Sequence, residues 1–206
     1  QMVEFDSSSV TAMIIFPKSQ KGKKLEILKE NNSWKVKLDD KHWAGVADKR
    51  IGSALNELKR LGSQRLAGNS KEQWREFETD TAGTRIQLFE GGKKTLDLIV
   101  GKFVFKGQRD MISYIRHEAE DQTYAVQAFL DISFNRYVND WRNQTLIDAT
   151  EEEWKKITFT YMGDSSFVLE KINKQWSIPG VQTDSIKVDE YIRSIQMLNH
   201  SDFAND

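Results

Sequence analysis

The sequence contains no cysteine and only two prolines among its 206 residues. Without cysteine the chain has no disulfides, no thiolate nucleophiles and no cysteine-ligated metal ions. No apolar run approaches the roughly 20 residues that a membrane-spanning helix requires, and no signal peptide is visible. Because the chain begins with Gln1 rather than methionine, we expect that a segment ahead of it has been removed.

An excess of one charge is also missing, since 30 Lys and Arg residues face 31 Asp and Glu residues for a net charge of −1. A balanced chain creates no long-range field toward nucleic acid or an anionic membrane. We therefore expect no nucleic-acid partner and no direct binding of this chain to lipid. A chain of this length buries roughly 70% of its extended surface on folding, which is enough for one large domain or two small ones.

Two stretches far apart in the chain have nearly the same sequence. Residues 25–36 align with residues 167–178 without a gap, and an apolar pattern of helical period follows each stretch. A repeated supersecondary unit explains this match better than coincidence does. The sequence therefore predicts two β-β-β-α copies. The identical aligned pairs include Lys29/Lys171, Asn31/Asn173 and Trp34/Trp176.

The first copy, over residues 8–68, starts with a β-prone run that ends at Pro17. Asp48 is expected to cap a helix that continues to Leu61, with Gly62 in the left-handed position after it. Strands are expected over residues 10–16, 25–28 and 34–38, and the helix over residues 48–61.

The second copy, over residues 150–206, is shorter and follows the same order. Between the copies, residues 69–149 contain four short alternating strands, which predict an antiparallel β-meander, and then a short helix. We expect an α+β fold, with antiparallel sheets, packed helices and two β-β-β-α copies flanking a β-meander. The expected strands are 84–88, 96–100, 111–116 and 123–126 in the middle, and 154–161, 167–169 and 176–178 in the second copy; the expected helices are 128–134 and a segment after Asp184.

No spacing typical of a catalytic or metal site occurs in the sequence. The three histidines, His42, His117 and His200, are far apart and show neither HxH nor HExxH spacing. Gly91-Gly92-Lys93 superficially resembles a phosphate-binding loop, but alternating strands flank it, so a hairpin turn is expected. Nothing singles out a pair among the carboxylates. We therefore expect a protein that is not an enzyme, with no catalytic residue, no cofactor and no bound metal.

Six tryptophans raise the hypothesis of a glycan-binding surface, because exposed indoles stack on sugar rings. Trp34 and Trp176 occupy the same position in both copies, which favours a structural role. Trp43, Trp74 and Trp154 lie in polar surroundings and are open to either interpretation, as half-exposed anchors or as ordinary rim residues.

The densest polar and aromatic stretch covers residues 135–146. Within it, Arg136, Asp140, Trp141 and Arg142 form the candidate recognition patch. The alternative, which we favour, is a structural lock in which Trp141 is buried between lobes and Arg142 is held by carboxylates or carbonyl groups.

Several motifs in the middle of the chain are similar to those of one bacterial family, catalogued as domain of unknown function 4340. The resemblance covers residues from about 10 to 162, and its middle block is the most specific part. The motifs look structural, so the resemblance supplies no catalytic residues. They are Gly83-Thr84-Arg85-Ile86, Gly91-Gly92-Lys93, Leu98-Ile99-Val100-Gly101-Lys102, Tyr124-Ala125-Val126 with Phe129-Leu130, and Ser133-Phe134-Asn135-Arg136 through Asp140-Trp141-Arg142 to Thr145-Leu146.

The resemblance implies an N-terminal membrane anchor ahead of an extracytoplasmic domain, encoded near ABC-transporter components of the gliding-motility type. The function expected from it is a non-catalytic, membrane-tethered interaction module of the cell envelope, on the periplasmic or outer face, accessory to an ABC-type transporter. Its partner would be a membrane protein. The alternative is a glycan- or small-ligand-binding module that uses exposed tryptophans, with Trp141 and Arg142 as candidates. A third hypothesis is an unrecognised hydrolase with an acid–base pair in a pocket.

Overall fold

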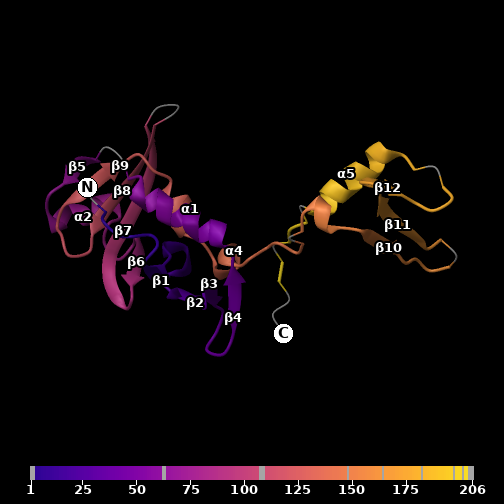
Figure 1. Cartoon of the computed structure of the whole chain (residues 1–206). Coiled ribbons are helices and arrows are strands. Elements are labelled where there is room, and N and C mark those ends of the chain that lie inside the picture. The colour runs from indigo at the N-terminus through magenta and orange to yellow at the C-terminus, as the bar shows by residue number, and fades with distance from the viewer. Residues whose placement is uncertain are drawn as a thin grey trace. The chain divides into compact units, whose positions relative to one another are not determined.

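The chain forms two compact units, which are visible in the computed structural model (Figure 1). Unit 1 covers Gln1–Asn143 and unit 2 covers Gln144–Asp206. The structure describes residues 3–61, 64–106, 110–147, 149–163, 165–181, 183–196, 198–200 and 202–203. Among these residues, no helix is both long enough and apolar enough to pass through a lipid bilayer.

Unit 1 is built on one nine-stranded antiparallel sheet in the order β4-β3-β2-β1-β6-β7-β8-β9-β5. The expected meander is confirmed, because β6, β7, β8 and β9 are neighbours in chain order. The pairing of β1 with β6 places the strands of segments 8–68 and 69–149 in the same sheet. The strands are β1 Val10–Phe16, β2 Leu25–Glu30, β3 Ser33–Lys37, β4 Trp43–Val46, β5 Gln64–Gly68, β6 Thr84–Glu90, β7 Lys93–Lys106, β8 Asp110–His117 and β9 Thr123–Val126.

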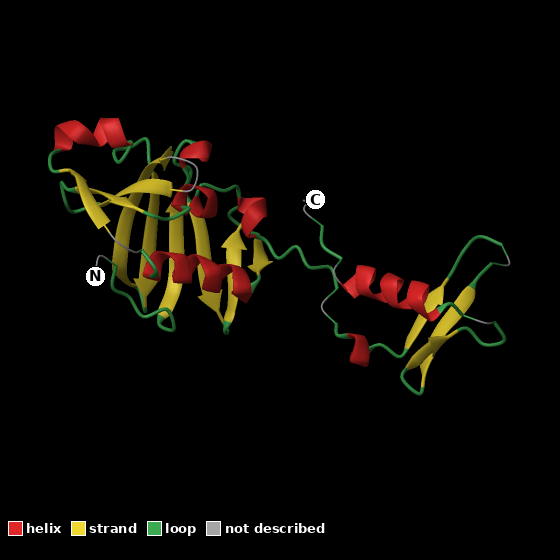
Figure 2. Cartoon of the chain, turned by 90° about the horizontal axis from the view of Figure 1, so that it is seen from above, coloured by secondary structure: helices red, strands yellow, loops and turns green. Residues whose placement is uncertain are grey.

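The helix α1 (Asp48–Lys59) crosses one face of this sheet (Figure 2). Its apolar residues recur at helical period, so Ile51, Leu55 and Leu58 all face the core and are buried. One expectation about its start was wrong, because Asp48 is the first helical residue and Ala47 holds the N-cap position without a side-chain hydrogen bond. Gly62, expected to follow the helix, lies outside the described residues. The shorter helices of unit 1 are α2 Trp74–Phe77, α3 Leu130–Phe134 and α4 Val138–Trp141, with single turns at Lys18–Gln20 and Lys71–Gln73.

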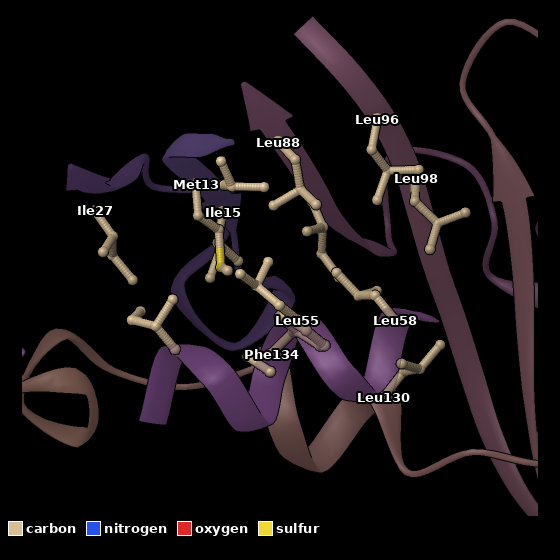
Figure 3. Close-up of a cluster of buried hydrophobic side chains, with 14 of the residues drawn as sticks. Met13, Ile15, Ile27, Leu55, Leu58, Leu88, Leu96, Leu98, Leu130 and Phe134 are labelled. Carbon is tan, nitrogen blue, oxygen red and sulfur yellow. The ribbon is translucent and has the colours of Figure 1, made fainter. Parts of the chain in front are cut away.

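The core of unit 1 lies between the sheet and the layer formed by α1 and α3. Met13, Leu88 and Leu98 point from the strands toward α1, which contributes Leu58, and Phe134 of α3 joins them (Figure 3). All five side chains have exposed fractions of 0%. Burying one such side chain stabilises the folded state by about 1.5–3 kcal/mol, so this layer contributes a large share of the free energy of unfolding.

Unit 2 is a smaller α+β unit. Its three-stranded antiparallel sheet has the order β10-β11-β12, and α5 packs against it over a core of Leu169, Trp176 and Ile192. Both units combine antiparallel sheets with packed helices, so the expected α+β class is confirmed. The elements are a single turn at Glu151–Glu153, β10 Lys156–Phe159, β11 Phe167–Ile172, β12 Gln175–Ser177 and α5 Ser185–Gln196.

The two stretches of similar sequence form similar hairpins. Each hairpin has a two-residue turn with both φ angles positive: 48° and 63° in the β2–β3 turn, 50° and 67° in the β11–β12 turn. In each, a lysine lies over the ring of the opposite tryptophan, at 5.9 Å for Lys29 on Trp34 and 5.5 Å for Lys171 on Trp176. One element has no counterpart, because β4 lies between β3 and α1, whereas the described residues between β12 and α5 contain no strand.

Candidate functional site

A pocket of about 330 Å³ lies between α1 and the segment that contains α3 and α4. This volume is at the small end of the range for ligand pockets, which suits a small molecule or one end of a larger one. The polar and aromatic residues in its lining are Lys49, Arg50, Ser53 and Glu57 from α1, and Ser133, Arg136 and Trp141 from the α3–α4 segment.

Two arginines face the same space in this pocket. Burial lowers the pKa of Arg50 below its ordinary value, the positive charge of Arg136 lowers it further, and Asp140 partly opposes both effects. Arg50 stays protonated, because an arginine in a protein does not lose its proton. Arg136 is oriented by its Nε, which donates a hydrogen bond to the carbonyl oxygen of Ile132 at 2.8 Å. The pocket therefore holds two like charges close together.

Trp141 lines the pocket as part of the hydrophobic core. Its side chain is 1% exposed, and its ring lies 6.3 Å from that of Phe134. Its Nε1 is buried and has no hydrogen-bond partner in the described part of the chain. The alternative of a ligand stacked on an exposed Trp141 is wrong for this structure, because neither face of the ring is open to solvent. Trp141 is buried, as the structural-lock interpretation predicted. It lies within the core of unit 1, however, and not between lobes.

The candidate recognition patch is only partly brought together. Arg136 and Trp141 line the same pocket. Asp140 lies beside it and accepts a hydrogen bond from the backbone N–H of Tyr137 at 2.9 Å, which closes the first turn of α4. Arg142 donates through Nη1 to Oδ1 of Asn139 at 3.4 Å, which is a long hydrogen bond. Arg50 completes the site, and sequence reasoning missed it because it lies on a distant helix.

The other tryptophans have diverse environments. Trp34 and Trp176 are 7% and 5% exposed, so their expected structural role is confirmed. Trp74 is covered by the guanidinium of Arg116, 3.7 Å above the ring, and its Nε1 donates to the carbonyl oxygen of Asp121. Trp43 is 39% exposed on the edge strand β4.

The polar motifs singled out in the sequence have structural surroundings. Gly91 and Gly92 form the two-residue turn between β6 and β7, each with positive φ, so the hairpin interpretation is confirmed. His42 pairs with Asp39, and Nδ1 of His200 accepts the N–H of Asp202. Among the described residues, no group of three or more His, Asp or Glu side chains is arranged to hold a metal ion.

Asp97 is the centre of a charged cluster on β6 and β7. Arg85 binds it through two hydrogen bonds of 2.7 and 2.8 Å, and Gln87 and Lys94 bind it as well. Its side chain is 12% exposed. Burial alone would raise the pKa of Asp97, but these hydrogen bonds and the charge of Arg85 outweigh it and lower the pKa to about 2.

We predict that unit 1 loses the stabilising contribution of this cluster in acid. A carboxyl group with a lowered folded-state pKa stabilises the fold above its unfolded value near 3.8, and that contribution disappears as the pH falls toward 2. Asp97→Asn should therefore lower the free energy of unfolding by about 1–2 kcal/mol at pH 7, and by much less at pH 2.5. Denaturant unfolding of the unmodified protein and of Asp97→Asn at both pH values checks this prediction. An equal loss of free energy of unfolding at the two pH values would contradict it.

Comparisons with known proteins identify a family but no characterised relative. The model of a family described as "Domain of unknown function (DUF4340)" matches residues 63–206, which is more than half of the chain. No curated protein and no solved structure matches. The match begins later than the resemblance noted in the sequence and extends through unit 2. Strands β1–β4 precede the matched residues, although they belong to the same sheet as β6–β9.

Proposed function

This chain belongs to the DUF4340 family, and from that premise we propose that it is a non-catalytic interaction module of the cell envelope. In this proposal a membrane anchor ahead of Gln1 tethers the domain to the extracytoplasmic face. The partner is a membrane protein, a subunit of an ABC-type transporter to which the module is accessory. The anchor, the location and the transporter are those that the sequence resemblance implies.

An exposed aromatic cluster on unit 1 carries the proposal that the protein acts through contacts. The ring of Phe103 lies 5.0 Å from that of Phe105 and 6.1 Å from that of Phe129. Phe105 is 68% exposed and Phe129 is 42% exposed. Isolated exposed apolar residues are ordinary, but contiguous exposed aromatic rings are typical of a surface that binds a protein. We call Phe103, Phe105 and Phe129 the aromatic cluster.

The carboxyl groups with shifted pKa values give no sign of a general acid among the described residues. A general acid needs a carboxyl group whose pKa is raised toward neutral pH. In the described part of the chain, every carboxyl group with a clear pKa shift has a lowered pKa, because hydrogen bonds stabilise the charged form. These groups are Asp6, Glu30, Asp39, Glu72, Asp97 and Glu153.

We also propose that β1-β2-β3-α1 and β10-β11-β12-α5 are two copies of one unit. The matching hairpin turns and lysine–tryptophan pairs support this. If the turns are equivalent, glycine should be favoured at their second positions, where φ is 63° at Asn32 and 67° at Lys174. We expect Lys174→Gly to stabilise unit 2 by about 0.5–1 kcal/mol, and Asn32→Gly to stabilise unit 1 by less, because asparagine tolerates this conformation better than lysine. Denaturant unfolding followed by NMR signals from each unit checks both variants. Destabilisation of unit 2 by Lys174→Gly would contradict the equivalence of the two turns.

The proposed partner is tested by chemical crosslinking in native membranes. The full-length, anchored protein is captured from crosslinked membranes, and the proteins bound to it are identified by mass spectrometry. We expect permease or ATPase subunits of an ABC-type transporter to be enriched over a mock capture. A capture in which the protein is recovered in good yield without any such subunit would refute the proposed partner.

A further inference from the structure

Two arginines in the pocket between α1 and the α3–α4 segment, Arg50 and Arg136, form no ion pair with a described residue. No described carboxylate lies within 4.0 Å of a guanidinium nitrogen of Arg50 or Arg136. Two guanidinium groups at close range in a half-buried site repel each other, so the folded protein gains when an anion enters between them. This arrangement differs from Arg85, whose guanidinium is neutralised by Asp97.

Trp141, which lines the pocket, also has an indole N–H that lacks an acceptor in the described part of the chain. The Nε1 of Trp141 is buried without a partner among the described residues, although a buried indole N–H normally has one. A site that holds two cationic guanidinium forks is complementary to an oxygen anion, and the indole N–H signal of Trp141 reports on what enters beside it. The exposed hydroxyl of Ser53, which also lines the pocket, donates to the carbonyl oxygen of Lys49 at 2.8 Å.

Charge and size decide which oxygen anion fits. Lys49, Arg50 and Arg136 carry three positive charges, while Glu57 in the lining and Asp140 beside it carry two negative ones. The surplus of one positive charge is balanced by a monoanion rather than by a doubly charged phosphate. The planar guanidinium fork matches a carboxylate, which accepts two parallel hydrogen bonds. The volume of about 330 Å³ admits that group and a few attached atoms.

We propose that this pocket is a carboxylate-binding site in which Arg50 and Arg136 hold the carboxylate beside Trp141. The carboxylate belongs to a small organic acid or to the C-terminal end of a polypeptide. The inference does not rest on the proposed transporter partner, since it concerns residues within unit 1 alone.

The indole N–H signals in a ¹H–¹⁵N NMR spectrum provide a direct test. The Trp141 signal is assigned by its absence in Trp141→Phe. The probes are sodium acetate, N-acetyl-triglycine with a free carboxylate, the same peptide as its C-terminal amide, sodium phosphate, and sodium chloride at matched ionic strength. We expect acetate to shift the Trp141 signal saturably, while the amide and chloride leave it unchanged. Binding of acetate alone assigns a small acid, and binding of the free-acid peptide as well assigns a chain end.

Variants of the two arginines link the signal to the pocket. Arg50→Gln and Arg136→Gln should each weaken acetate binding at least about tenfold, because each removes a charge-assisted hydrogen bond. Arg75→Gln, which changes an exposed arginine on α2, serves as the matched control and should leave binding unchanged. The remaining signals of each spectrum report whether the variant is folded. Equal shifts with the amide, tighter binding of phosphate than of acetate, no saturable shift with either carboxylate, or unchanged binding in both arginine variants would overturn the proposal.

Discussion

Gly101→Ala is expected to destabilise unit 1 by about 3 kcal/mol or more. A Cβ atom at this position would lie 2.0 Å from the carbonyl oxygen of Phe77 and 2.8 Å from Cγ2 of Thr79. The oxygen belongs to the backbone, so it cannot rotate away as a flexible side chain would. Gly101 also lies where the register between β7 and β8 shifts, between Val100 and Phe103. The added methyl group must therefore displace β7 or the end of α2, and overpacking of this kind is strongly destabilising.

The matched control is another glycine-to-alanine change in the same unit. Gly52 lies within α1, and a Cβ atom there would meet nothing within 4 Å. Gly52→Ala should raise the free energy of unfolding by up to about 1 kcal/mol, because alanine is the better helix former. Denaturant unfolding followed by NMR signals of β6–β8 measures both changes. A change at the protein surface usually alters the free energy of unfolding by no more than about 0.5 kcal/mol. A loss smaller than about this value for Gly101→Ala would show that α2 does not pack closely on β7.

Arg116→Met is expected to cost unit 1 about 3 kcal/mol. Arg116 is 3% exposed, and its guanidinium lies over the ring of Trp74. Methionine keeps much of the apolar stem but leaves the carbonyl oxygens without a donor and removes the cation–π contact. This arginine therefore fixes the turn after β8 against α2. Its Nε donates to the carbonyl oxygen of Thr79 at 2.9 Å, and its Nη1 donates to those of His117, Glu118 and Glu120 at 3.0, 2.9 and 2.9 Å.

Two further variants separate charge from geometry at this position. Arg116→Lys keeps the positive charge but lacks the planar fork, so most of the loss should remain. Arg75→Met, at an exposed arginine, should change the free energy of unfolding by no more than about 0.5 kcal/mol. Thermal or denaturant unfolding of the three variants provides the comparison. Full stability in Arg116→Lys would mean that the charge alone, rather than the set of four carbonyl contacts, holds the turn.

Local pattern predicted most of the elements of unit 1. In β6, Ile86 and Leu88 alternate with polar residues, and a period of two is visible without knowledge of the fold. The edge strands β4 and β5 were missed, because they are short and largely exposed and their existence depends on pairing with β3 and β9. The pairing of β1 with β6 was also out of reach, since it joins segments that no local signal connects.

Only part of the candidate site was predicted, because local pattern does not reveal which distant segments meet. Arg136 and Trp141 stood out because they lie in one dense polar and aromatic stretch. Arg50 did not, because a charged residue on the outer side of an amphipathic helix resembles any solvated side chain until the tertiary structure shows what faces it. The burial of Trp141 was the favoured interpretation, but its place in the lining of a pocket depends on how α1 and the α3–α4 segment pack.

The central claim is that the protein acts through a surface on unit 1 that contacts a membrane protein. The most direct measurement replaces Phe105 by a photoreactive aromatic amino acid in the full-length, anchored protein and irradiates native membranes. The same replacement at Lys21, an exposed residue in a turn of unit 1, is the control. We predict a covalent adduct with a transporter subunit from position 105 and none from position 21. Efficient photolysis that yields no adduct at position 105, or the same adducts from both positions, would contradict the claim.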